Sequence, residues 1–93
     1  MKSYCSIECI SKKYVRCELE LIPVEESRTI AFAEKKTEMV EIPAEMISTV
    51  IPKIEEGDII VVSHDRGSIE NICYCDNEEK ARRIALIKEL LED

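Results

Sequence analysis

The chain has 93 residues, 45% of them hydrophobic and 35% charged, and carries a net charge of −7. A chain of this length forms one domain with a modest core, and its acidic charge disfavours nucleic acid and anionic membrane surfaces as partners. Aromatic residues are sparse, so we expect a core of Ile, Val, Leu and Cys.

Two N-terminal segments, residues 4–10 and 14–21, alternate between apolar and polar side chains, as half-buried strands do. In the first, Cys5, Ile7 and Cys9 are predicted to point inward and Tyr4 outward. The polar break at residues 11–13 predicts a hairpin between them. The inward set of the second strand is predicted to be Val15, Cys17, Leu19 and Leu21.

Pro23 ends the second strand, since it has no N–H for the sheet ladder. We expect a loop over residues 24–27 and a third strand over residues 28–33, with Ile30 and Phe32 pointing inward. Together they form an inserted hairpin arm, residues 22–37. A fourth strand is predicted at residues 38–42, followed by one helical turn that begins at Pro43.

The segment from Ile54 to Val62 is the strongest fold signal. Gly57 suits a turn that needs a positive φ, and the β-branched run after it predicts a strand from residue 58 to about 63, buried on both faces. Gly67 marks another turn. A sixth strand is predicted at residues 69–75, with two faces: Ile69, Asn71, Cys73 and Cys75 on one, Ile72 and Tyr74 on the other.

Asp76 and Glu79 have the spacing of a helix N-cap, so a helix is predicted over residues 76–93. We expect this docking helix to bury its apolar seam against the body formed by residues 1–75. The predicted seam is Ile84, Ile87, Leu90 and Leu91. The predicted fold is one domain, residues 1–93, that is mainly β with one C-terminal helix: a small antiparallel barrel or curled sheet of about five to six strands, SH3-like or OB-like.

Several short motifs in this order carry a family resemblance: residues 40–43 (Val-Glu-Ile-Pro), 51–52 (Ile-Pro), 56–59 (Glu-Gly-Asp-Ile) and the helix led by Asp76. Over residues 38–93 the chain resembles the small bacterial family known as domain of unknown function 3006. The resemblance implies a β-barrel-like body with a short, Arg-bearing C-terminal helix and a bacterial origin. It implies no activity.

The five cysteines are the first candidates for chemistry, because three are predicted to point into the sheet and two share a face of the last strand. Structural zinc sites use a Cys-x-x-Cys knuckle, which this chain does not contain, and free Cys is often a small buried hydrophobe. We therefore predict reduced, metal-free core residues, with a redox role left open. The residues are Cys5, Cys9, Cys17, Cys73 and Cys75.

The single histidine and the basic residues are further candidates for a functional site. His64 beside Asp65 could act as a base, but a polar strand end is the simpler interpretation, since only Ser63 and Ser68 are near in sequence. Basic residues gather in two places, which fits either a solubilising face or contact with an acidic partner. They are Lys80, Arg82 and Arg83 on the helix, and Lys12, Lys13 and Arg16 on the first hairpin.

From these residues we predict no catalytic residue, no cofactor and no metal: the protein is not an enzyme. We expect a protein-interaction or accessory module whose partner is a second copy or another protein, with nucleic acid unfavoured and no membrane. An OB- or SH3-like oligonucleotide-binding module is the alternative, with Tyr4, Tyr14 and Tyr74 as stacking residues. A cytoplasmic location is expected, because Met1 leads into no signal peptide and no apolar run spans a bilayer.

Overall fold

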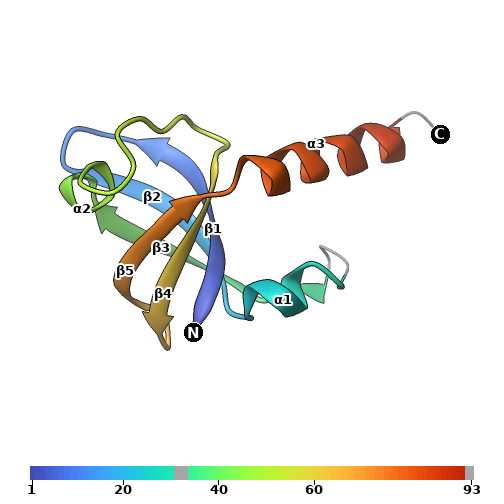
Figure 1. The fold of residues 1–93 in the computed structure, drawn as a ribbon, viewed down its shortest axis with the longest axis horizontal. Coiled ribbons are helices and arrows are strands. Elements are labelled where there is room, and N and C mark those ends of the chain that lie inside the picture. The colour runs from blue at the N-terminus through green and yellow to red at the C-terminus, as the bar shows by residue number, and fades with distance from the viewer. Residues whose placement is uncertain (31–33, 92–93) are drawn as a thin grey trace.

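A computed structural model describes residues 1–30 and 34–91 (Figure 1). The described chain is mainly β, as predicted, with a C-terminal helix and two much shorter helices. Its strands are β1 (Lys2–Ile10), β2 (Tyr14–Glu20), β3 (Thr37–Pro43), β4 (Ile59–Asp65) and β5 (Ser68–Cys75). Its helices are α1 (Val24–Ser27), α2 (Ala44–Ser48) and α3 (Asn77–Leu91).

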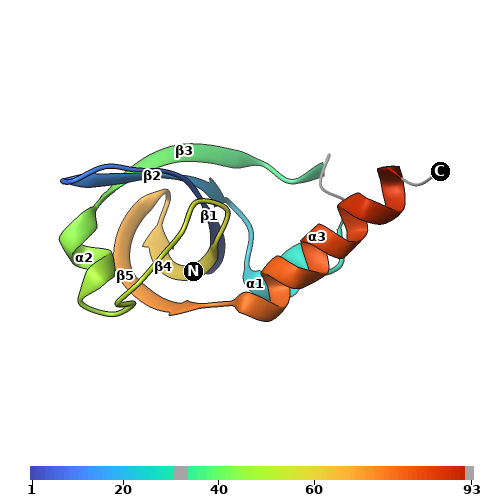
Figure 2. The same ribbon diagram turned by 90° about the horizontal axis from the view of Figure 1, so that it is seen from above.

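The strands form one antiparallel sheet in the order β3-β2-β1-β4-β5, which curls into a half-barrel (Figure 2). The long first strand pairs with β2 along its second half and with β4 along its first half, so both parts of the sheet share it. A helix separates β3 from β4, and β3 and β5 are the two edge strands. This order is that of an OB-type sheet left open between β3 and β5, rather than that of an SH3-type barrel.

The main core fills the inside of the curl. Aliphatic side chains dominate it, with two thiols among them, as the composition predicts. The residues at its centre include Cys5, Ile7, Val15, Cys17, Leu19, Ile42, Ile60 and Val62.

Strand β4 is buried on both faces, as predicted from its β-branched run. Ile60 and Val62 face the main core, whereas Ile59 and Val61 face a second apolar cluster on the outside of the sheet. Tyr4 of β1 and Val24 of α1 complete this outer cluster. Tyr4 lies on the outer face, as the alternation predicts, but α1 and the start of α3 cover that side and leave the residue fully buried.

Register shifts explain two other differences from simple alternation. Between Ile7 and Cys9 the β1–β2 pairing shifts, and Cys9 is exposed rather than inward. The β4–β5 pairing shifts twice. Ile69 and Ile72, which were predicted to lie on opposite faces of the strand, therefore both contact the main core. A β-bulge adds an unpaired residue and reverses the side-chain phase beyond it, which a period-two pattern cannot reveal.

The described parts of the predicted hairpin arm, residues 22–30 and 34–37, differ from the prediction. Val24–Ser27 is the short helix α1, where a loop was expected, and residues 28–30 form a turn instead of starting a third strand. The expected inward position of Phe32 lies outside the described residues. The part of the chain that the structure describes has five strands, because residues 28–30 of the predicted third strand are a turn and its remaining residues, 31–33, lie outside the described residues.

Both glycine turns are as predicted: Gly57 and Gly67 have φ values of 94° and 89°. Arg66 is left-handed too, with φ 52°, so the β4–β5 hairpin turn has positive φ at both central positions.

Helix α3 begins at the end of β5 and extends away from the sheet (Figures 1 and 2). The prediction that its apolar seam is buried against the body is wrong: Leu90 and Leu91 are 72% and 79% exposed, and Ile84 and Ile87 about half exposed. The buried residues of this helix are instead Glu79 and Arg83. No helix within the described ranges is long and apolar enough to cross a membrane.

Candidate functional site

A buried network of charged and polar side chains joins α3 to the sheet and to the segment around α1. We call it the anchor network. It consists of Tyr4 from β1, Glu20 from the end of β2, Ser27 from α1, Lys35, and Glu79 and Arg83 from α3.

Arg83 is the centre of the anchor network. Its Nη1 lies 2.8 Å from Oε2 of Glu20, and its Nε donates to Oε2 of Glu79 at 2.6 Å. The guanidinium also stacks over the ring of Tyr4, 5.0 Å from the centroid, and Nη2 donates to Ser27 Oγ at 3.4 Å. One side chain thereby joins α3 to β1, to the end of β2 and to α1, all more than 50 residues earlier in the chain. This use suits the planar, multiply donating guanidinium.

Glu79 lies one helical turn before Arg83 and bonds to two arginines. Arg82 donates to it through Nε at 2.7 Å and Nη2 at 2.8 Å, in addition to the bond from Arg83. Burial by itself would raise the pKa of this carboxyl, but the hydrogen bonds from Arg82 and Arg83 outweigh it and lower the pKa to about 2. Glu79 is therefore ionised at neutral pH although it is buried.

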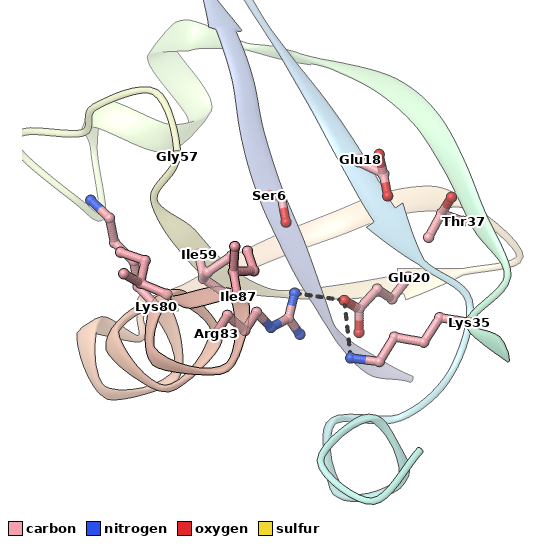
Figure 3. A pocket seen from close by; sticks show the side chains of 11 residues that line it. Ser6, Glu18, Glu20, Lys35, Thr37, Gly57, Ile59, Lys80, Arg83 and Ile87 are labelled. Carbon is pink, nitrogen blue, oxygen red and sulfur yellow. Dashed lines mark ion pairs between the residues drawn. The ribbon is translucent and has the colours of Figure 1, made fainter. Parts of the chain in front are cut away.

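Both carboxylate oxygens of Glu20 contact other members of the anchor network. Ser27 Oγ donates to its Oε1, while Oε2 faces Arg83 and also Lys35 Nζ at 3.8 Å (Figure 3). Burial lowers the pKa of Lys35, and the Glu20 carboxylate opposes that shift. Alternation along β2 correctly places Glu20 on the outer face, but this face is covered here and the carboxylate is buried.

The start of α3 has a second set of contacts. Asp76 caps the helix as predicted, since its Oδ1 accepts from the Glu79 N–H at 3.0 Å. Its Oδ2 accepts from Tyr4 Oη at 3.3 Å and lies 3.6 Å from Arg28, which donates through Nε to the same tyrosine oxygen at 2.9 Å. On the other side of the helix, Lys80 bonds to Asp58 at 2.7 Å.

These contacts make the anchor network a structural joint rather than a reactive centre. No buried side-chain N or O atom of the described residues lacks a hydrogen-bond partner. The acidic groups are matched by cations, and no hydroxyl or thiol among them lies beside a free base. What the network does is fix where α3 leaves the sheet.

A groove of about 340 Å³ lies beside this joint, between α3 and the outer face of the sheet (Figure 3). Ser6 and Glu18 lie on the sheet side of the groove and Ile87 of α3 on its helix side. Ile84 of α3 lines it too. Ile59, Lys35 and Lys80 also line it. The groove thus joins an apolar helix face to a polar sheet face, and the sequence did not reveal it because its two sides are far apart along the chain.

His64 is buried and its ring nitrogens are both bonded. Nδ1 accepts from the Gly67 N–H at 3.2 Å, which leaves the proton on Nε2 to be donated to Ser3 Oγ at 2.8 Å. Ser3 in turn donates to the Ile22 carbonyl at 2.7 Å. A general base needs a free lone pair toward its nucleophile, and here that nitrogen carries the proton. Burial lowers the pKa of His64, in keeping with this neutral, structural role.

The thiols divide by position. Cys5 and Cys17 are buried in the main core, where the hydrogen bond between them and burial raise the pKa of Cys5. Cys9 is exposed, and Cys73 and Cys75 are partly buried. Among residues 1–30 and 34–91, no group of three or more His, Cys, Asp or Glu side chains could hold a metal ion.

The exposed face of β2 and β3 is where an OB-type sheet binds oligonucleotides. In this chain Tyr14 and Met39 lie there, both half exposed. Arg16 lies 3.7 Å from Glu41 on the same face, which also carries Glu18. Of the three predicted stacking residues, Tyr4 is buried, and Tyr74 is exposed on a different strand. The acidic groups on this face oppose a phosphate backbone.

No family model, curated protein or solved structure matches this chain. The resemblance to domain of unknown function 3006 therefore stays a prediction.

Proposed function

We propose that this protein is a non-catalytic interaction module that binds a protein segment with the projecting half of α3 and the groove beside it. The observation that carries the proposal is the exposure of the apolar residues of α3 past Arg83. Four large aliphatic side chains are exposed within eight residues: Ile84, Ile87, Leu90 and Leu91. Contiguous apolar surface of this kind on a small domain is characteristic of an interaction site.

The anchor network supports the same function. A helix of 15 residues is only marginally stable by itself, so a projecting helix needs a firm base. Buried ion pairs seldom add stability over well-packed apolar residues, but they do fix geometry. Here they hold α3 at one orientation and leave its apolar side chains free to meet a partner.

Position-specific photo-crosslinking tests the proposal. A photo-reactive benzoylphenylalanine replaces Leu90 in the full chain, expressed in its source organism, and replaces the exposed Ala85 in the matched control. Ala85 lies on a different side of the helix, since five residues turn an α-helix by about 140°. We expect a protein adduct from position 90 and none from position 85. Equal adducts at both positions, or none at either, would contradict the proposal.

An oligonucleotide-binding function is the second candidate, favoured by the OB-type strand order. Fluorescence anisotropy with a labelled single-stranded oligonucleotide tests it. Because the net charge is −7, we expect no binding at about 0.15 M salt. Salt-dependent binding that is lost on substituting Tyr14 would replace the first proposal with this one.

A further inference from the structure

We propose that the partner of α3 is a second copy of this chain, with the two helices exchanged in an antiparallel, two-fold arrangement. This inference rests on the proposed function and names the occupant of its site. In the dimer, the projecting end of each helix lies in the groove between the other copy's helix and sheet.

The direction of α3 is the first reason. The helix starts at the sheet and points away from it, so its free end carries Leu90 and Leu91 to the far tip of the molecule (Figure 1). A two-fold axis across the helix brings the tip of one copy back beside the base of the other. A two-fold dimer then fills the grooves of both copies, whereas a head-to-tail contact would leave one groove empty at the end and build open filaments.

The match between tip and groove is the second reason. The groove of about 340 Å³ offers Ile59, Ile84 and Ile87 as apolar lining, and the tip offers two leucines. Antiparallel pairing about Ile87 places the leucines of one copy beside the isoleucines of the other. Antiparallel helices also set the negative C-terminal end of one dipole near Lys80 of the other copy, which lines the groove and pairs with Asp58.

Charge complementarity is the third reason. Glu18, on the sheet side of the groove, forms no ion pair within the described chain, and Lys88, on the projecting half of α3, forms none there either. In the exchanged dimer these two residues come from different copies and have opposite charges. We assign Lys88 of each copy to Glu18 of the other.

The assignment gives a charge-exchange test by sedimentation velocity on the full chain. The wild-type protein is expected to be a weak dimer, with a Kd of about 10 to 100 μM for a small interface. Glu18→Lys places two lysines at each contact and Lys88→Glu places two glutamates there, so each variant alone should be monomeric at 100 μM. An equimolar mixture of the two should form heterodimers, because both contacts then join opposite charges.

Matched controls carry the same charge changes elsewhere: Glu45→Lys on α2 and Lys53→Glu in the loop after it, both exposed. These variants should dimerise as the wild type does. Circular dichroism verifies that all four variants keep the fold, so that loss of dimer is not loss of structure.

The outcomes separate this inference from the proposed function. A wild type that is monomeric at 100 μM, or single charge variants that dimerise like the wild type, would overturn the exchanged dimer. If the crosslink from position 90 then yields an adduct heavier or lighter than two chains, the interaction function stands with a different protein as partner. An adduct of two chains together with heterodimers in the mixture is the result expected here.

Discussion

The two halves of α3 differ in which kind of side chain they bury. The first half, up to Arg83, buries charges and is held by the anchor network, while the second half exposes aliphatic residues and touches little. In most surface helices the apolar stripe docks and the charges face water. The reversal shows that a helix can be attached by a few well-matched ion pairs, which leaves its apolar face available for another molecule.

The largest expected effect on stability is seen by comparing two truncated forms of the chain, one that ends after Cys75 and one that ends after Arg83. Ending the chain after Cys75 removes Glu79 and Arg83, leaves Glu20 buried without its main cation and uncovers Tyr4. We expect a loss of about 5 kcal/mol or more, comparable with the total stability of a small domain, so this form should be unfolded. Ending it after Arg83 keeps the anchor network and should cost less than about 1 kcal/mol.

Urea denaturation followed by circular dichroism measures both forms, at low micromolar concentration so that any dimer is dissociated. Equal stability of the two truncated forms would mean that the halves of α3 do not differ in the way described.

Substituting single arginines sharpens the comparison within the first half. Arg83→Ala removes one cation from each of two buried carboxylates, which leaves Glu79 with Arg82 and Glu20 with the more distant Lys35, and it should destabilise the fold by about 3 kcal/mol. Arg82→Ala is the matched control, because this side chain is 41% exposed and shares only Glu79. We expect about 1 kcal/mol for it, from chemical denaturation. A smaller loss at Arg83 than at Arg82 would contradict the central place of Arg83.

Acid should weaken the first half through Glu79. Its folded-state pKa is about 2, below the usual value of 4.5, so its contribution is fully present above pH 4.5 and is lost as the pH falls toward 2. The size of this contribution is on the order of 2 kcal/mol. In Glu79→Gln the free energy of unfolding should be lower at pH 7 and fall less between pH 5 and pH 2.5. Parallel pH curves for the two proteins would refute this role.

The smallest effect on stability is expected in the second half. Leu90→Ser changes a side chain that is 72% exposed and should alter the free energy of unfolding by less than about 0.5 kcal/mol. Burial of a leucine elsewhere would cost several times as much, as Leu19→Ser in the main core should show. Thermal melts at low protein concentration check this pair. A large loss at Leu90 would mean that the tip packs within its own chain.

Local pattern was sufficient for most of the sheet. Alternation predicts the β1–β2 hairpin, the β-branched run predicts that β4 is buried on both faces, and the Asp76 spacing predicts the start of α3. Each of these depends on residues close together in the chain. The bulges after Ile7 and along β5 could not be predicted in the same way, because an extra residue in one strand is defined only by its partner strand.

What the sequence determined by itself is the set of strong local elements: a mainly β domain, its glycine turns and an amphipathic C-terminal helix. Only the tertiary structure decided which face of that helix docks. Hydrophobic periodicity ranks faces by their apolar content, so it pointed to Ile84 and Ile87. The structure instead buries Arg83, because Glu20 and Tyr4, more than 60 positions earlier in the chain, provide the charge and the ring that compensate for taking it out of water.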